Sequence, residues 1–172
     1  NPEKSFNEGH EKLNAIQARI KISTPDPYLN AAARASIIAV DATWQSPTYM
    51  HGALYGRMPL PGWRSIYGGT MFGWHDRVKT EAKYYTSFQT KVSDKKLPKA
   101  SIVAKLTEQD KDSRFYGVGH IDKDQRGYNM QSQFFDQLIK DWRWTADPEL
   151  ERILRPALEL HLIWAKECFD PY

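Results

Sequence analysis

The sequence of 172 residues contains a single cysteine, Cys168. One thiol cannot form an internal disulfide or a cysteine-based zinc site, so we expect Cys168 to pack as a small apolar side chain. Long apolar runs are also missing, since the longest apolar-leaning stretch, residues 31–40, is interrupted by Arg34 and Ser36. A bilayer span needs ~20 apolar residues, which predicts a protein without a membrane span.

The sequence also lacks an excess of charge of one sign. The 24 basic and 21 acidic residues leave a net charge of +3, and no run of Lys or Arg is present. Nucleic acid requires a basic patch, so we expect no nucleic-acid partner. There is no glycine-rich phosphate loop, no Gly-x-Ser-x-Gly turn and no recognised spacing of metal ligands, which predicts neither a cofactor nor a bound metal.

Strand-like alternation is absent, and helical periodicity dominates the sequence. It predicts helices over residues 6–22, 28–43, 75–92, 127–144 and 148–169, with a possible short helix over 99–106. The pairs Asp26-Pro27 and Asp147-Pro148 have the side-chain acceptor and the first-turn proline that begin a helix. Residues 28–43 are apolar on most of the helix circumference, so we expect this helix to be buried on several sides. The fold class is therefore all-α, and residues 1–172 form one helical domain.

The last two helices are joined by only a few residues, which predicts an antiparallel pair. Pro156 lies within the final helix and should bend or locally break it. The expected buried stripe of the first helix of the pair is Met130, Phe134, Leu138 and Trp142. That of the second is Ile153, Ala157, Leu158, His161, Leu162 and Ala165, with His161 a core histidine.

Residues 44–74 interrupt the helical pattern. They hold three tryptophans, three tyrosines and six of the ten glycines, together with three prolines. A structureless connection of this length is uncommon in a compact domain unless it is functional, and this one is too aromatic for a disordered linker. We expect an ordered, non-helical loop that covers one end of the helices.

Four blocks carry a further signal: Trp44-Gln-Ser-Pro-Thr-Tyr-Met-His-Gly-Ala, Pro59-Leu-Pro-Gly-Trp-Arg, Gly73-Trp-His-Asp-Arg and Tyr128-Asn-Met-Gln-Ser-Gln-Phe-Phe-Asp-Gln. With the end of the sequence, Leu160-His-Leu-Ile-Trp-Ala-Lys-Glu-Cys-Phe-Asp-Pro, they resemble bacterial six-hairpin glycosidase-like proteins. The resemblance covers residues 26–172. It implies helical hairpins of an (α/α)6 toroid, of which 172 residues supply about half, and a periplasmic or extracellular location.

Sugars are bound by aromatic faces that stack on the pyranose ring and by polar side chains that hydrogen-bond the hydroxyls. Asp76 is the candidate catalytic carboxylate, because it stands where the aromatic loop gives way to a helix. A glycosidase needs two carboxylates, and Asp41 is the candidate companion. Alternatively, Asp76 interacts with the helix dipole, and Asp41 is a cap or a solvent-facing residue. The candidate substrate-binding residues are Trp44, His51, Trp63, Arg64, Trp74, Tyr128 and Asn129.

Asp136 lies next to the apolar stripe, and we expect a structural ion pair with Arg34 or Arg143. Asn129 has the alternative role of a local helix cap.

The resulting hypothesis is a glycoside hydrolase-like domain that acts on polysaccharide or oligosaccharide. The alternatives are a non-catalytic carbohydrate-binding or scaffold domain, or a polysaccharide lyase that uses Tyr128 with Arg64 or His51. Since half of a toroid would lack a second positioned carboxylate, we expect residues 1–172 alone to be inactive as a glycosidase. Exposed inner helices should also favour self-association or contact with the remainder of the toroid.

Overall fold

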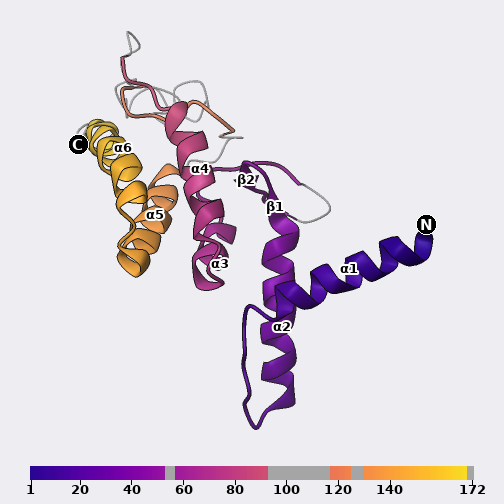
Figure 1. The fold of residues 1–172 in the computed structure, drawn as a ribbon. Helices are drawn as coiled ribbons and strands as arrows, with labels where there is room; N and C mark the ends of the chain where they lie inside the picture. Colours follow the sequence, from indigo (N-terminus) through magenta and orange to yellow (C-terminus); the bar gives the residue numbers. More distant parts are fainter. Residues whose placement is uncertain (53–56, 93–116, 125–129, 170–172) are drawn as a thin grey trace, which may run out of the picture.

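The computed structural model describes residues 1–52, 57–92, 117–124 and 130–169 (Figure 1). Over these residues the chain is mostly helical, with six helices and one two-stranded sheet. The elements are α1 (Pro2–Gln17), α2 (Pro27–Thr43), β1 (Trp44–Gln45), β2 (Thr48–Tyr49), α3 (Ser65–Met71), α4 (His75–Ser87), α5 (Gln131–Thr145) and α6 (Pro148–Phe169). The all-α prediction is confirmed at this level. The possible helix over 99–106 lies outside the described residues.

Helices α3 to α6 lie side by side, α2 runs along one flank of this bundle, and α1 projects away from it (Figure 1). The main core contains aromatic and aliphatic residues from α3, α4, α5, α6 and β2. Tyr85 of α4 packs edge to face on Phe134 of α5, with ring centroids 5.5 Å apart, and both side chains are fully buried. Burial of such large rings supplies much of the hydrophobic stabilisation of the bundle.

The prediction that residues 28–43 are buried on several sides is wrong. In α2 only Ile37 is buried, whereas Tyr28 and Leu29 are 84% and 58% exposed. The physical reason is that α2 packs mainly on α1 and α3, and α1 itself has no buried residue. Two flanks of an apolar helix therefore remain open in the described part of the chain.

The predicted helix starts are confirmed at atomic detail. Asp26 Oδ1 accepts hydrogen bonds from the backbone amides of Tyr28 and Leu29, at 2.8 and 3.4 Å. Asp147 Oδ1 accepts the equivalent bond from the amide of Glu149 at 2.8 Å. Each carboxylate satisfies amides that have no partner inside the helix.

Helices α5 and α6 form the expected antiparallel pair (Figure 1). Ala146, in the left-handed conformation with φ 51°, closes α5 immediately before α6 begins. The predicted stripe of α5 faces the core, with Phe134 and Leu138 fully buried. On α6, Ala157 and His161 are buried, but Leu162 is 57% exposed, so its predicted inward position is wrong. Helix α6 runs through Pro156 as one element.

The region between α2 and α4 is ordered where it is described, but it is not free of secondary structure. Strands β1 and β2 pair antiparallel, with Trp44 opposite Tyr49. Residues 65–71 form α3, so the prediction of a wholly non-helical loop is wrong there. Residues 53–56 lie outside the described part.

The backbone of this region is hydrogen-bonded to a side chain of α5. Gln137 Nε2 donates to the carbonyl oxygens of Gly62 and Trp63, each at 3.0 Å. Gly62 has φ +83°, and a Cβ atom at this position would lie 2.2 Å from the carbonyl oxygen of Met130. Glycine is required here for both its conformation and its lack of a side chain.

At the same N-terminal end of α5, buried side-chain amides hold residues 117–124 against α5 and α6. Gln131 Nε2 donates to the carbonyl of Gly119 at 2.7 Å, and Gln131 Oε1 accepts from the amide of Ile121 at 2.8 Å. His161 Nδ1 lies 3.1 Å from Gln131 Nε2, and its ring stacks on Phe135. The prediction of a core histidine is confirmed, and burial lowers the pKa of His161 to about 4.

Replacing Gly62 by alanine should lower the free energy of unfolding by more than about 1 kcal/mol, because the new methyl group would collide with the backbone of α5 at a strained φ. Urea unfolding followed by far-UV circular dichroism measures this change. The matched control is Gly9→Ala on α1, where a Cβ atom has no neighbour within 4 Å. That substitution should leave stability unchanged or raise it by up to about 1 kcal/mol. Equal effects at the two glycines would contradict the packing argument.

Candidate functional site

The first turn of α4 carries three consecutive polar residues that are held differently. His75 Nδ1 lies 2.8 Å from Asp141 Oδ1 on α5. Arg77 Nη2 donates to Asp41 Oδ1 at the end of α2, at 2.7 Å. Asp76 stands between them, is exposed, and its carboxylate makes no hydrogen bond or ion pair with the described residues. The turn is thus fixed on both sides to carboxylates of two other helices, while its own carboxylate remains free.

The guanidinium group of Arg77 joins Asp41, Trp44 and Trp74 into one unit, which we call the Arg77 cluster. Its carbon lies 4.3 Å from the ring centroid of Trp74 and 5.5 Å from that of Trp44. The Arg77–Asp41 ion pair is only partly exposed, at 19% and 18% of the two side chains. Cation–π contacts and a shielded ion pair reinforce one another here, because both stabilise the charge of Arg77.

The two tryptophans of the Arg77 cluster differ in access. Trp74 is 5% exposed, and Arg19 lies over its ring at 5.1 Å, in addition to Arg77. A stacking platform needs an open ring face, so Trp74 acts here as a support for the two arginines. Trp44 is half-buried and contacts Tyr49 edge to face, with centroids 4.8 Å apart. It retains accessible ring surface.

Two of the other predicted substrate-binding residues, His51 and Trp63, contact each other. His51 packs on Trp63 with ring centroids 4.1 Å apart, and both side chains are half-buried. Arg64 is exposed at the start of α3. Tyr128 and Asn129 lie outside the described residues.

A buried polar centre was missed from the sequence. Asp141 is 0% exposed, and its Oδ1 atom accepts from Thr70 Oγ1 at 2.7 Å as well as contacting His75. Its Oδ2 atom is buried and has no hydrogen-bond partner among the described residues. The signal was present, since Asp141 follows Phe134 and Leu138 at helical spacing and so extends the buried stripe.

Asp136 forms an ion pair, but the predicted partners Arg34 and Arg143 were wrong. It lies 2.7 Å from Lys140 Nζ, one helical turn away, and accepts a short hydrogen bond from the hydroxyl of Tyr67. The hydrogen bonds from Lys140 and Tyr67 lower the pKa of Asp136. The i,i+4 spacing along α5 explains why the local lysine is the partner.

Glu81 of α4 is a second buried carboxyl group, 1% exposed. Its Oε2 atom accepts a hydrogen bond from the backbone amide of Tyr49 at 2.8 Å, which ties β2 to α4. Burial raises the pKa of Glu81 well above its ordinary value, because the charged form loses its hydration. Burial also raises the pKa of the neighbouring Tyr49 and Tyr85 hydroxyls.

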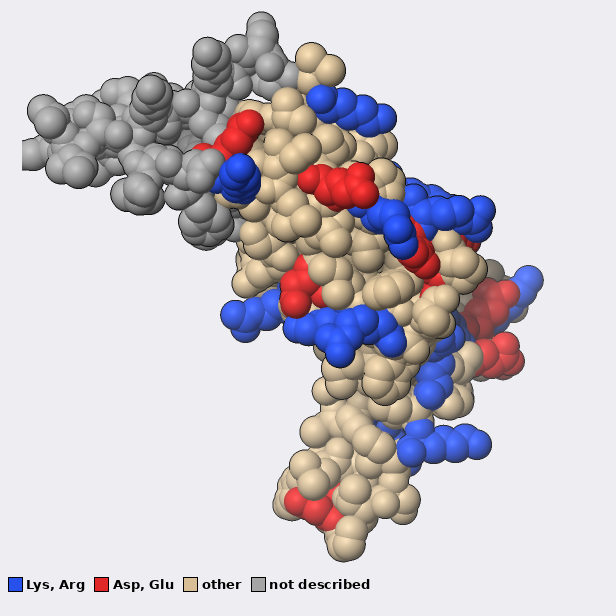
Figure 2. Space-filling model, turned by 90° about the vertical axis from the view of Figure 1, so that its left-hand side faces the viewer, with Lys and Arg blue, Asp and Glu red and all other residues tan. Residues whose placement is uncertain are grey.

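Charge on the surface is mixed. On the face drawn in Figure 2, basic and acidic side chains adjoin one another. Between α4 and α6, Lys79 pairs with Asp147 and Glu149, and Lys83 also pairs with Glu149, at 2.6–3.0 Å. Within the described residues, no group of three or more His, Cys, Asp or Glu side chains is arranged to hold a metal ion. None of the described helices is long and apolar enough to cross a membrane.

Comparisons with protein-family models, with curated proteins and with solved structures find no match.

The raised pKa of Glu81 predicts a specific pH dependence. As the pH rises above the ordinary glutamate value of about 4.3, Glu81 ionises in the unfolded chain before it does so in the folded protein. The contribution of Glu81 to the free energy of unfolding should therefore fall through this window. Glu81→Gln should remove this contribution. The stability of E81Q relative to the unchanged protein should increase with pH in urea titrations.

The matched control for this measurement is Glu159→Gln, at an exposed position of α6. Its stability should follow that of the unchanged protein at every pH. Parallel pH curves for E81Q and the unchanged protein would show that Glu81 is not destabilised by burial.

Proposed function

We propose that this chain is a glycoside hydrolase-like domain built on helical hairpins of an (α/α)6 toroid, with Asp76 as its catalytic or sugar-orienting carboxylate. The observation that carries the proposal is the first turn of α4, in which His75 and Arg77 are tied to Asp141 and Asp41. The exposed carboxylate of Asp76 makes no hydrogen bond or ion pair with the described residues. A reactive group is most effective when its backbone is rigid and its own side chain is accessible. Asp76 has both properties.

The surroundings of Asp76 supply the other chemistry that sugar handling requires. Arg77 directs its guanidinium onto Trp44, whose ring is half-buried rather than sealed. An accessible indole beside charged hydrogen-bonding groups is suited to a pyranose ring, which has both apolar C–H faces and equatorial hydroxyls. Asp41 is the companion carboxylate, held in position by its bond to Arg77.

A non-catalytic carbohydrate-binding domain is the second candidate, and one observation favours it. Asp41 is engaged with Arg77 at 2.7 Å, so a carboxylate needed for acid–base chemistry is committed to an ion pair. Inverting hydrolysis requires a second carboxylate that activates water ~6.5–9.5 Å from the first. If Asp41 only orients Arg77, the same surface binds a sugar without cleaving it.

Unpartnered apolar surface at both ends of the helical array supports the toroid. At one end, Tyr28 and Leu29 of α2 are exposed, and at the other Leu162 of α6 is exposed. A groove of about 360 Å³ between α5 and α6 is lined by apolar side chains, among them Leu154, Leu158 and Leu162. Further hairpins on both flanks would bury these surfaces, as closure of a ring of hairpins requires. A periplasmic or extracellular location belongs to the same proposal.

The decisive variants are Asp76→Asn and Trp44→Ala, made in a protein that includes the remaining hairpins of the proposed toroid and tested on a panel of neutral and acidic polysaccharides. D76N should reduce release of reducing ends by about 10²–10⁴-fold while leaving binding nearly unchanged, because it removes proton transfer without changing shape. W44A should weaken binding by roughly 10-fold, equivalent to about 1.4 kcal/mol. Isothermal titration calorimetry and a reducing-sugar assay measure the two effects.

Trp44→Phe and Tyr28→Ala are the controls. The first retains an aromatic ring if W44A alters folding, and the second removes an exposed ring of α2 that belongs to no proposed sugar-binding surface. Binding that depends on Trp44 without any hydrolysis would favour the binding domain. If no member of the panel binds, the carbohydrate proposal is wrong.

A further inference from the structure

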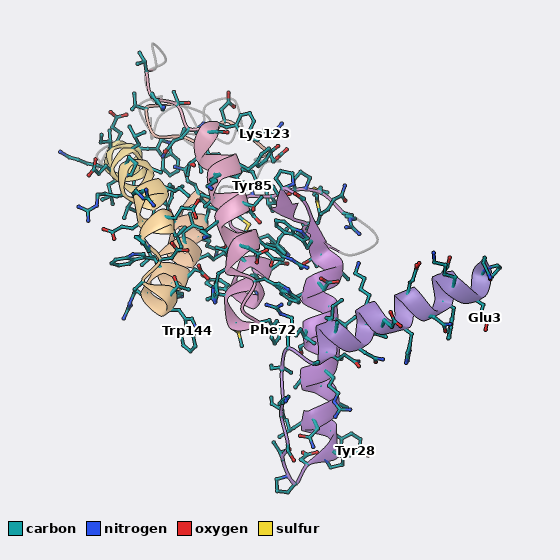
Figure 3. All side chains as sticks on the ribbon, viewed as in Figure 1. Glu3, Tyr28, Phe72, Tyr85, Lys123 and Trp144 are labelled. Carbon is teal, nitrogen blue, oxygen red and sulfur yellow. The ribbon has the colours of Figure 1, made fainter. Side chains whose placement is uncertain are left out.

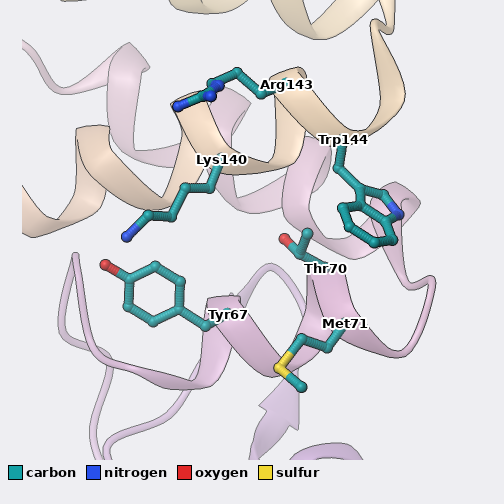
Figure 4. Close-up of a pocket in the computed structure, with 6 residues that line it drawn as sticks. All are labelled: Tyr67, Thr70, Met71, Lys140, Arg143 and Trp144. Atoms are coloured by element: carbon teal, nitrogen blue, oxygen red, sulfur yellow. The ribbon is translucent and has the colours of Figure 1, made fainter.

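A groove between α3 and α5 lies outside the predicted site. Its volume is about 720 Å³, within the range of small-molecule sites. Figure 4 shows the six lining residues, which are Tyr67, Thr70, Met71, Lys140, Arg143 and Trp144. Three come from α3 and three from α5, each set at i, i+3 and i+4 spacing. One ridge of each helix therefore faces the other across open space.

The rim of the groove exposes two large apolar side chains. Trp144 is 78% exposed and Met71 is 76% exposed, whereas Trp142 on the same helix packs against the core. Trp144 projects from the end of α5, away from the bundle (Figure 3). Its indole makes an open aromatic face beside a groove of mixed polar and apolar side chains, which core packing does not explain.

The polar side chains of the groove are oriented by partners behind them. Thr70 donates its hydroxyl hydrogen to the buried Asp141, so its oxygen presents lone pairs as acceptors. Tyr67 donates to Asp136, and Lys140 spends one of its three donors on the same carboxylate.

Arg143, which also lines the groove, makes no hydrogen bond or ion pair with any described residue (Figure 4). The groove therefore combines fixed acceptors with free donors.

The charge of the groove is partly compensated. Lys140 is paired with Asp136, and the carboxylate of Asp141 is buried behind Thr70 and faces His75. Because Lys140 is already paired, the groove has less attraction for a strong anion and offers mainly hydrogen-bonding groups, which suit a ligand with many hydroxyl groups. One ring face with hydroxyl-binding groups at its edge is the arrangement that a pyranose fits.

We propose that the α3–α5 groove is a binding subsite for a neutral saccharide, in which one sugar ring stacks on Trp144 and its hydroxyls are bound by Thr70, Lys140 and Arg143. The inference rests on the proposed carbohydrate function and adds to it a sugar contact outside the Arg77 cluster. An exposed tryptophan could instead pack against a second copy of this chain. This alternative gives a different outcome in the same experiment.

The test uses Trp144→Ala, Trp144→Phe and Arg143→Gln in the whole chain, titrated with cellohexaose, xylohexaose and mannohexaose, and with an oligogalacturonate as the anionic comparison. For the neutral hexasaccharide that binds the unchanged protein, W144A should weaken binding roughly 10-fold and R143Q roughly 3- to 10-fold. W144F should retain most of the affinity because it keeps a stacking ring. Calorimetry gives the affinities, and circular dichroism checks that each variant is folded.

Tyr28→Ala, which removes a distant exposed ring, should leave every affinity unchanged (Figure 3). Binding that is lost in W44A but unchanged in W144A overturns the groove and leaves the proposed function intact. Binding that depends on Trp144 but not on Trp44 supports the groove and overturns the Arg77 cluster as a sugar site. Binding of none of the hexasaccharides, or of the oligogalacturonate alone, overturns the neutral subsite. Light scattering completes the test, because it measures the mass of each protein in solution. If W144A has a lower mass than the unchanged protein but the same sugar affinity, Trp144 mediates self-association and the subsite proposal is overturned.

Discussion

The position of the Arg77 guanidinium group is the constraint on which the candidate site depends. It lies over Trp74, contacts the ring of Trp44 and bonds to Asp41. These partners come from the end of α2, from β1 and from the turn before α4, so a single side chain links three segments. The energy of this arrangement does not arise from the ion pair alone, because an exposed pair contributes little. Shielding by two indole rings makes the pair effective, and it fixes the backbone of Asp76.

The elements that could be predicted from the sequence are those whose signals are local. Asp26 and Asp147 cap α2 and α6 as expected, since a cap involves only the next three residues. Helix α3 could not be predicted, because Gly68 and Gly69 disfavour a helix. Their role is tertiary. A Cβ atom at Gly68 would lie 2.5 Å from Val40 Cγ2, and one at Gly69 would lie 2.6 Å from the hydroxyl of Tyr49. Glycines that suggested a loop in fact allow helices to approach closely.

The difference between local and tertiary signals also explains which site residues could be predicted from the sequence. Residue types suited to sugars were recognisable in the sequence, but the access of each ring was not, since Trp44 is half-buried and Trp74 is only 5% exposed. Access depends on the arginines that cover each ring. The acid at Asp141 was recognisable in principle, because a carboxylate on an apolar stripe has a partner when it is buried. The partner, Thr70, lies on α3, and this helix could not be predicted from the sequence because it contains two glycines. The exposure of α2 could not be predicted from the sequence either. The apolar character of a helix predicts that its surface should be covered, but not which part of the chain covers it.

Helix α3 connects the two proposed sugar contacts. Gly68 and Gly69 face α2 and β2, whereas Tyr67, Thr70 and Met71 line the groove with α5. The first turn of α4 also contacts both regions. Arg77 bonds to Asp41 of α2, and His75 contacts Asp141, which in turn accepts a hydrogen bond from Thr70 of the groove. A displacement of α3 would therefore alter both surfaces together, because it moves one wall of the groove and loosens the support of the turn that presents Asp76. The glycine pair that holds α3 against α2 and β2 is thus a geometric requirement of the candidate site, although neither glycine lines it.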